Sequence, residues 1–264
     1  MTLIVGILCE EGVVLGADGQ ATLGTGTGVR TVRQQVKKVN KIGDSAAIAT
    51  SGPVGLGQQF NAALQELWTN GKLSGKSPHE AMAIMQAAFW PHCEREFISA
   101  RATVPILGNV ALESAISYTM VAIPVKKRPC LIQFNHQCSP ELATPDLPFI
   151  ALGSGQPLAD PFLAFLRRIF WSNRLPKVSE GVLATIWCIN QAILTNPGGV
   201  GEPIQIITLE KDQKSEFKVR ELPESEFAEH EQAIADAESA LAKYREHMQP
   251  TKGTAEIPPN PPSS

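Results

Sequence analysis

The sequence has little charge and no strongly basic segment. Only 19% of its 264 residues are charged, the formal net charge is -3 and the isoelectric point is near 6.0. Nucleic-acid-binding proteins concentrate lysine and arginine, so nothing in this composition favours a nucleic-acid partner. The cysteines are few and scattered, without a CxxC pair, which is typical of reduced thiols and not of a disulfide framework or a zinc site.

Long hydrophobic runs are also missing. No uninterrupted apolar stretch reaches the roughly 20 residues that span a bilayer. The N-terminus has neither the basic region nor the small-residue cleavage site of a signal peptide, because Met1 is followed at once by the β-rich run at 2–5. We therefore expect a soluble, cytoplasmic protein without membrane contact.

What the sequence does contain is short β-rich runs in its first part. Residues 3–8 and 13–17 predict a hairpin, and residues 36–42 and 45–51 predict a second pair of strands. Hydrophobic residues make up 43% of the chain, which is ample for the core of one large domain or two small ones.

Helical periodicity begins after Gly52. Apolar residues at 54–68 fall on one helical face, and Ser77 to Glu80 is typical of a capped start for a helix that runs to about Ser99. Residues 101–115 show no period and predict a loop. Further strands are predicted at 116–123, 130–134, 149–152, 204–209 and 217–220, and helices at 156–171 and 179–194. This order favours two packed sheets with helices outside both, and not an alternating βαβ sheet.

The C-terminal part has a different composition. Residues 224–248 are rich in alanine and glutamate, and Phe227, Ile234, Leu241 and Met248 are spaced by sevens. This stripe predicts either a helix packed on its own domain or a helix that contacts another subunit. The proline- and serine-rich end of the chain is typical of disorder. The predicted divisions are a domain at 1–222, a helical extension at 223–248 and a disordered tail at 249–264.

Thr2 is the first candidate for chemistry. A threonine directly after the initiator methionine is small enough for Met1 to be removed, and its free α-amine would then lie beside its own hydroxyl. An α-amine titrates at about 7.7–8.0, so near neutral pH it can accept the hydroxyl proton as a general base. Threonine activated by its own amine is one form of nucleophilic catalysis, although threonine is also common at this position without any such role.

Several segments follow one another in the order of a known family. Residues 2–6 (TLIVG), 16–24 (GADGQATLG), 36–39 (VKKV) and 51–52 (SG) together resemble the opening of proteasome β-subunits and of the peptidase HslV. The similarity extends to about Leu209, dense at first and sparse later. It implies the N-terminal-nucleophile hydrolase fold, which is an α+β four-layer αββα sandwich of two antiparallel sheets flanked by helices.

The resemblance implies a role for each matching residue. Thr2 would be the nucleophile, Lys38 would ease deprotonation of its hydroxyl and amine, and Asp18 would be the counter-ion that a buried lysine needs. The backbone N–H of Gly52 would donate to the tetrahedral oxyanion, an interaction typically worth about 2.7–4 kcal/mol. Ser154 would support the amine and relay a proton.

The resemblance also implies substrate and cation contacts. Thr22 would bind substrate through its backbone, and Thr50 would line the pocket for the side chain before the cut. Proteasome β-subunits carry a further aspartate and serine where this sequence has an alanine and a threonine, as HslV has, so turnover could be slow. No cofactor is required, but a monovalent cation such as Na⁺ could be held by the backbone carbonyls of Ile189, Ala192 and Thr195.

Each motif also has an ordinary structural interpretation. The Asp18-Gly19 pair is typical of a turn that ends a strand, the lysines at 37–38 could be solvated, and the loop at 153–155 could precede a helix cap. The GTGTG loop at 24–28 lacks the GK[ST] ending of a phosphate-binding loop, so we reject that function for it. The histidines share no metal-ligand spacing.

Three functions follow from these patterns. The first is a threonine-type peptidase whose homo-oligomer forms a double ring, heptameric or alternatively hexameric, around a chamber that admits peptides or unfolded protein. An ATP-dependent unfoldase would be its partner by analogy only. The second is a catalytically weak or inactive ring-forming scaffold subunit, in which the helix from Glu224 mediates assembly. The third is an N-terminal-nucleophile amidase that acts on a small molecule.

Overall fold

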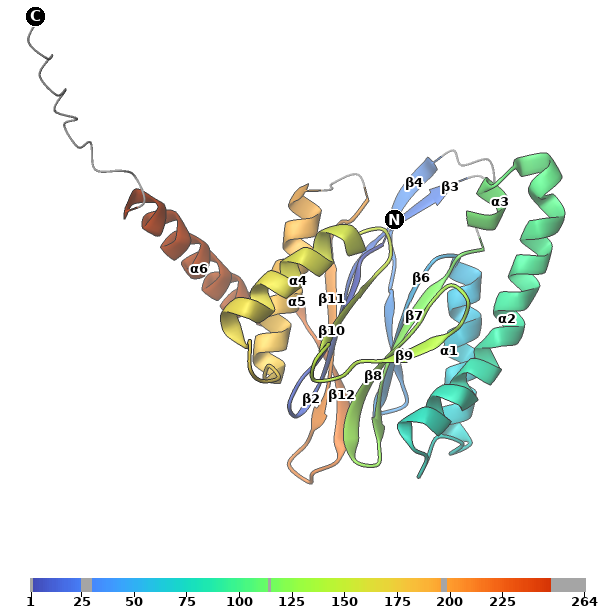
Figure 1. The fold of residues 1–264 in the computed structure, drawn as a ribbon, viewed down its shortest axis with the longest axis horizontal. Helices are drawn as coiled ribbons and strands as arrows, with labels where there is room; N and C mark the ends of the chain where they lie inside the picture. Colours follow the sequence, from blue (N-terminus) through green and yellow to red (C-terminus); the bar gives the residue numbers. More distant parts are fainter. Residues whose placement is uncertain (1, 25–29, 114, 196–198, 248–264) are drawn as a thin grey trace, which may run out of the picture.

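Two five-stranded sheets form the centre of the computed structural model, which describes residues 2–24, 30–113, 115–195 and 199–247 (Figure 1). The first sheet contains, in spatial order, β10 (Phe149–Leu152), β1 (Ile4–Leu8), β2 (Gly12–Asp18), β11 (Ile204–Lys211) and β12 (Phe217–Leu222). The second contains β5 (Val39–Ile42), β6 (Ala46–Ser51), β7 (Tyr118–Val125), β8 (Arg128–Phe134) and β9 (Pro140–Leu142). All neighbouring strands are antiparallel, and β3 (Gln20–Gly24) and β4 (Arg30–Gln35) form a separate ribbon.

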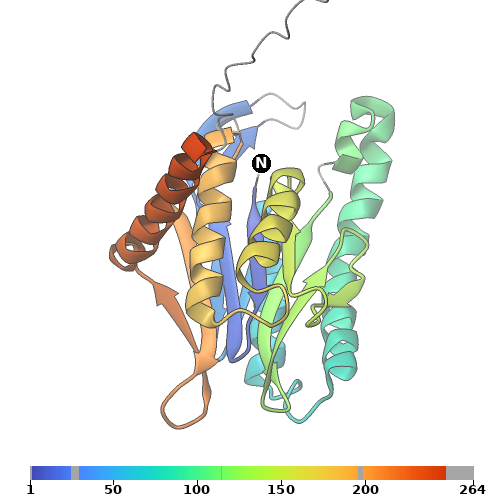
Figure 2. The same cartoon turned by 60° about the vertical axis from the view of Figure 1, so that its left-hand side comes forward.

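Helices cover the outer faces of both sheets (Figures 1 and 2). Over the second sheet lie α1 (Val54–Thr69) and α2 (Pro78–Leu107), followed by the short α3 (Val110–Glu113). Over the first sheet lie α4 (Gln156–Phe170) and α5 (Val178–Thr195). A 3₁₀ turn at Glu224–Glu226 leads into α6 (Phe227–His247), which packs against α5. The predicted four-layer αββα sandwich is therefore confirmed.

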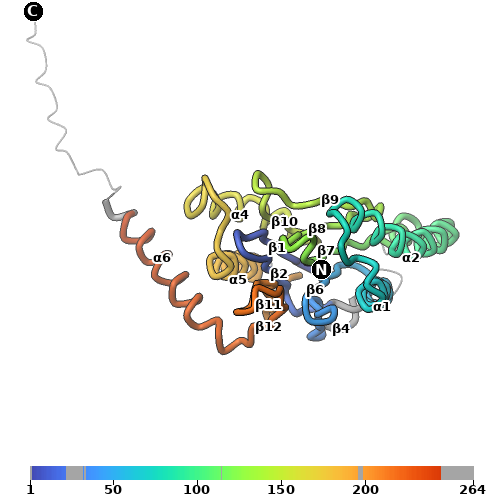
Figure 3. The backbone as a smooth tube through the Cα atoms, turned by 90° about the horizontal axis from the view of Figure 1, so that it is seen from below, coloured from blue at the N-terminus to red at the C-terminus, as the bar shows by residue number. Residues whose placement is uncertain are grey.

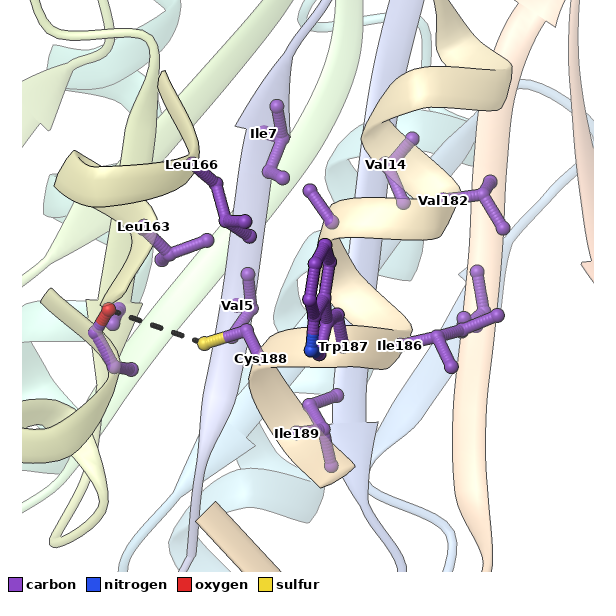
Figure 4. Close-up of a cluster of buried hydrophobic side chains, with 14 of the residues drawn as sticks. Val5, Ile7, Val14, Leu163, Leu166, Val182, Ile186, Trp187, Cys188 and Ile189 are labelled. Atoms are coloured by element: carbon purple, nitrogen blue, oxygen red, sulfur yellow. Dashed lines mark hydrogen bonds between the residues drawn. The ribbon is translucent and has the colours of Figure 1, made fainter. Parts of the chain in front are cut away.

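Alternation along β1 shows how the layers are held together. Val5 and Ile7 face α4 and α5, whereas Ile4 and Leu8 face the second sheet, because successive side chains of a strand point to opposite faces. Both faces are buried, so the strand is apolar throughout. Figure 4 shows the helix-facing layer, which includes Val5, Ile7, Val14, Leu163, Leu166, Val182, Ile186, Trp187, Cys188 and Ile189.

Among the described helices, α5 alone has the length and mean hydropathy, 1.2, that could cross a membrane. Its position explains this composition, since 56% of the helix is buried and it packs on β1, β2 and β11. Core helices of globular domains pass the same test of length and hydropathy.

Helix α2 differs most from the sequence prediction. It runs to Leu107, beyond the expected end near Ser99 and through residues predicted to be a loop. These residues show no apolar period because most of them are exposed, and Pro105 in the last turn adds a further signal against helix. The strand predicted at 36–42 begins only at Val39.

The C-terminal helix packs on its own domain through its first half. Phe227 and Ile234 are buried against α5, and Trp187 Nε1 donates to Glu238 Oε1 at 2.9 Å. Beyond that contact Leu241 and Tyr244 are exposed, and α6 runs away from the sheets (Figure 3). Met248, the predicted tail and most of the GTGTG loop lie outside the described residues.

Candidate active site

The antiparallel topology brings the predicted site residues to one end of the two sheets. Thr2 precedes β1 and Lys38 precedes β5, so both strands start at this end. Asp18 ends β2, Gly52 follows β6 and Ser154 follows β10, so these three strands finish there. Residues from distant parts of the sequence therefore meet at the same end of the two sheets.

A buried ion pair lies at the centre of the site. Lys38 Nζ is 2.6 Å from Asp18 Oδ1, and the two side chains are only 6% and 0% exposed. Lys38 Nζ also donates to the carbonyl oxygen of Gln20 at 2.6 Å. Burial lowers the pKa of Lys38, and the neighbouring carboxylate of Asp18 opposes that shift. The lysine is thus held in place by two acceptors.

Asp18 also fixes the backbone around the site. Its Oδ1 accepts from the backbone N–H of Leu3 at 2.9 Å, directly after Thr2. Its Oδ2 accepts from the backbone N–H groups of Gln20 and Gly201, both at 3.2 Å. One carboxylate therefore ties together the start of β1, the start of β3 and the loop before β11.

The loop after β10 holds Thr2. The Thr2 nitrogen donates to Ser154 Oγ at 3.1 Å, and the backbone N–H of Gly155 donates to the Thr2 carbonyl at 3.1 Å. Gly153 has φ of +91°, and a Cβ there would lie 2.3 Å from the Thr2 carbonyl oxygen. Only glycine fits this close approach, so Gly153 is a positioning residue that the sequence did not single out.

Gly52 presents a free backbone donor. Its φ is +121°, and a Cβ would lie 2.5 Å from the carbonyl oxygen of Ile116, so the position requires glycine. Its N–H makes no hydrogen bond to any residue in the described ranges. An unpaired N–H at the mouth of a cavity can donate to a developing oxyanion.

Two cavities have Thr2 in their walls. One, of about 440 Å³, is lined by Thr2, Lys38, Thr50 and Gly52 together with one face of α1. The other, of about 360 Å³, is lined by Thr2, Gly52 and Ser154 among others. The two cavities share Thr2 and Gly52, so both offer room next to the candidate nucleophile.

The two predicted substrate contacts lie near the larger cavity. Thr50 lines it, and its Oγ1 would be 2.6 Å from a Cβ at Gly57, so α1 approaches β6 closely there. Thr22 lies within β3, where its backbone is paired with Arg33 of β4. The adjacent Ala21 also lines the cavity.

The predicted cation ligands lie in the last turns of α5. Ile189 and Ala192 are buried, and Thr195 Oγ1 donates to the Gln191 carbonyl at 2.7 Å. Their carbonyls follow at intervals of three residues, and the cation site stays a prediction. Within the described ranges, no group of three or more His, Cys, Asp and Glu side chains gathers that could hold a metal ion.

Comparisons with known proteins show which family and which folds the chain resembles. A family model described as "Proteasome subunit" matches residues 2–89, and no curated protein matches the chain. A Gly-1 mutant of Anbu from Hyphomicrobium sp. strain MC1 superposes with a TM-score of 0.64 at 18% identity, covering 92% of this chain and 97% of that one. Anbu from Yersinia bercovieri, described as an ancestral beta-subunit, gives 0.67 at 12% identity and covers 91% and 97%. Anbu from Pseudomonas aeruginosa, described as a helical assembly, gives 0.67 at 18% identity and covers 99% and 98%.

The fold is that of the N-terminal-nucleophile hydrolases. Its two antiparallel sheets between helical layers match the solved structures over almost the whole chain. The resemblance to bacterial proteasome-type subunits is confirmed, by sequence over residues 2–89 and by fold beyond them.

Proposed function

We propose that the chain is a threonine-type peptidase subunit of a self-compartmentalising homo-oligomer, with Thr2 as its N-terminal nucleophile after removal of Met1. One observation carries the proposal: Thr2, Gly52 and Lys38 line one cavity, and behind it Lys38 is paired with the buried Asp18. The similarity of residues 2–89 to proteasome subunits supports it.

The proposed reaction begins with attack of Thr2 Oγ1 on the carbonyl carbon of the peptide. The hydroxyl proton moves to the free α-amine of Thr2, and the oxyanion accepts a hydrogen bond from the Gly52 N–H. When the tetrahedral intermediate collapses, the α-ammonium gives its proton to the leaving amine and an ester remains on Thr2. Water, deprotonated by the same amine, then hydrolyses that ester and regenerates the hydroxyl.

Lys38 and Ser154 assist without reacting. The positive charge of Lys38 favours the deprotonated forms of the nearby hydroxyl and amine, and Asp18 makes its burial tolerable. Ser154 Oγ contacts the Thr2 nitrogen and can relay protons between it and water. This chemistry requires no cofactor.

Assembly is the second part of the proposal. The Anbu structure from Pseudomonas aeruginosa is described as a helical assembly, and the shared fold supports a homo-oligomer here. We favour a double heptameric ring, with hexameric rings as the alternative, in the cytoplasm. Peptides or unfolded proteins would enter its chamber, with or without an ATP-dependent unfoldase. Two cavities next to Thr2 offer more room than a small molecule needs, which favours a peptide as the substrate.

Peptide hydrolysis by matched variants tests the proposal. Thr2→Ala should abolish turnover, whereas Thr2→Ser, which keeps a hydroxyl beside the amine, should retain part of it. Size-exclusion chromatography with electron-microscope class averages should show the same large assembly for all three proteins. Full activity of Thr2→Ala would exclude this nucleophile, and an active monomer would favour the small-molecule amidase.

A further inference from the structure

The larger cavity beside Thr2 carries a cluster of side-chain amides. Helix α1 contributes Gln58, Asn61 and Gln65, which share one face of the helix because they are three and four residues apart. Strand β5 contributes Asn40 to the same cavity. Amides next to a nucleophile indicate which substrate side chain the cavity accepts.

Among the described residues, one of the four amides is engaged, Gln58 is exposed to solvent, and the other two are half-buried and free to bind a ligand. Gln65 is engaged, because its Nε2 donates to Thr69 Oγ1 at 3.1 Å and its Oε1 accepts from the Gly43 N–H at 3.4 Å. The side chains of Asn40 and Asn61 make no hydrogen bond within the part of the chain that the structure describes. Both are half-buried, so their remaining partners are water and whatever enters the cavity.

The two charged side chains among the described residues that line this cavity are already paired. Lys38 is held by Asp18 and the Gln20 carbonyl. Lys37 Nζ turns to Glu221 Oε1 at 2.7 Å. A basic substrate side chain would therefore lose its hydration without finding an opposite charge, and an acidic one would have to displace Glu221 from Lys37.

A purely apolar side chain also fits poorly. Ala21, Val36 and Val54 give the cavity apolar walls, but such a side chain would displace water from Asn40 and Asn61. Their amides would then lose hydrogen bonds without replacement, which is costly for half-buried groups.

We propose that this cavity selects peptides with glutamine or asparagine immediately before the scissile bond, and that Asn40 and Asn61 recognise the amide. A primary amide both donates and accepts, so it can pair with another amide in either orientation. The apolar walls would contact the methylene groups of the substrate side chain. The inference rests on the proposed function, because it requires Thr2 to be the nucleophile.

Fluorogenic peptides that differ only in this residue test the inference on the full chain after Met1 removal. The value of kcat/KM for glutamine should exceed those for leucine, aspartate and lysine by about tenfold, the factor for one net hydrogen bond. Asn61→Leu keeps the side-chain size and should lower the glutamine-to-leucine ratio by about the same factor. Gln59→Leu, on α1 but outside the cavity, should leave the ratio unchanged.

The ratio separates recognition from folding, because a folding defect lowers both rates equally. If Asn61→Leu does not fold, Asn40→Val should produce the same shift. Failure of a β-lactone to label Thr2 in the wild type would overturn the proposed function and this inference with it. Labelling of Thr2 without a preference for glutamine, or with a ratio that Asn61→Leu leaves unchanged, would overturn this inference alone.

Discussion

At the scale of single residues, the site depends on a lysine whose surroundings satisfy its charge. Lys38 Nζ contacts a carboxylate and a carbonyl oxygen, and the carboxylate of Asp18 receives three backbone N–H groups besides. Removing one member of a buried pair leaves the other charge without compensation, so a change at Lys38 should affect both the proposed activity and the stability.

Lys38→Ala should therefore lower turnover at least about a hundredfold, a typical loss for a group that assists proton transfer. It should also lower the free energy of unfolding by about 3–5 kcal/mol, because Asp18 stays buried. Arg220→Ala is the control, since that exposed pair with Glu226 lies outside the cavity and is worth at most about 1 kcal/mol. Peptide hydrolysis and urea unfolding measure the two effects, and equal behaviour of the two variants would contradict the assignment.

Gly153→Ala should prevent Thr2 from occupying its position. The new Cβ would lie 2.3 Å from the Thr2 carbonyl oxygen, so the backbone before β1 must move. Gly108→Ala is the control, because Gly108 also has positive φ but nothing lies within 4 Å of its Cβ position. We expect both variants to lose about 1–2 kcal/mol of stability from the left-handed backbone. Only Gly153→Ala should lose labelling of Thr2, and retained labelling would show that this contact is dispensable.

Activity should depend on pH through two groups. The α-amine of Thr2 must be uncharged to accept a proton, so kcat/KM should rise with pH up to about 8. Lys38 must be charged, and burial lowers its pKa. Activity should therefore decline again at a pH lower than 10.5, the ordinary pKa of a lysine. A pH–rate profile of kcat/KM checks both limbs, and a profile that rises without a break to pH 10.5 would exclude a role for the lysine charge.

The residues that the sequence identified are those that belong to an ordered set of motifs. Thr2, Asp18, Lys38, Gly52 and Ser154 were predicted from the order of motifs, and the fold places them together. The contacts that position them were missed because they use backbone groups, such as the N–H of Gly201 on Asp18. A backbone donor belongs to every residue except proline, so it leaves no signal in a sequence.

At the scale of elements, the apolar period predicted the helices and strands that bury one face against a neighbouring layer. α1 and α5 each present a clear apolar face to a sheet, and their bounds were predicted closely. The end of α2 was missed because its last turns are exposed and Ile106 is 83% exposed. Where no neighbouring element covers a helix, its apolar residues do not recur with the helical period.

Helix α6 offers a test at this scale. Ile234→Ala should lower the free energy of unfolding by about 2–5 kcal/mol, because the side chain is 7% exposed and packs on α5. Leu241→Ala, one heptad further and 57% exposed, should change it by less than about 0.5 kcal/mol. Urea unfolding at a fixed protomer concentration measures both. An unchanged Ile234→Ala variant would show that α6 leaves α5 in solution, and dispersal of the assembly by Leu241→Ala would reveal a subunit contact.

At the scale of the whole molecule, the candidate site residues lie at one end of the two sheets, and helices cover both outer faces. This arrangement suits a subunit whose reactive end faces a chamber while its helices contact neighbours. The fold alone does not establish hydrolysis, because one fold supports many functions. The proposed hydrolysis therefore depends on whether Thr2 has a free amine and a reactive hydroxyl.

Intact-mass spectrometry of the chain after incubation with a peptide epoxyketone tests this most directly. If Thr2 is the nucleophile, the chain should have a mass that lacks Met1 and includes one inhibitor adduct. The adduct should map to Thr2 and be absent from Thr2→Ala. Retention of Met1 throughout, or an equal adduct on Thr2→Ala, would contradict this assignment.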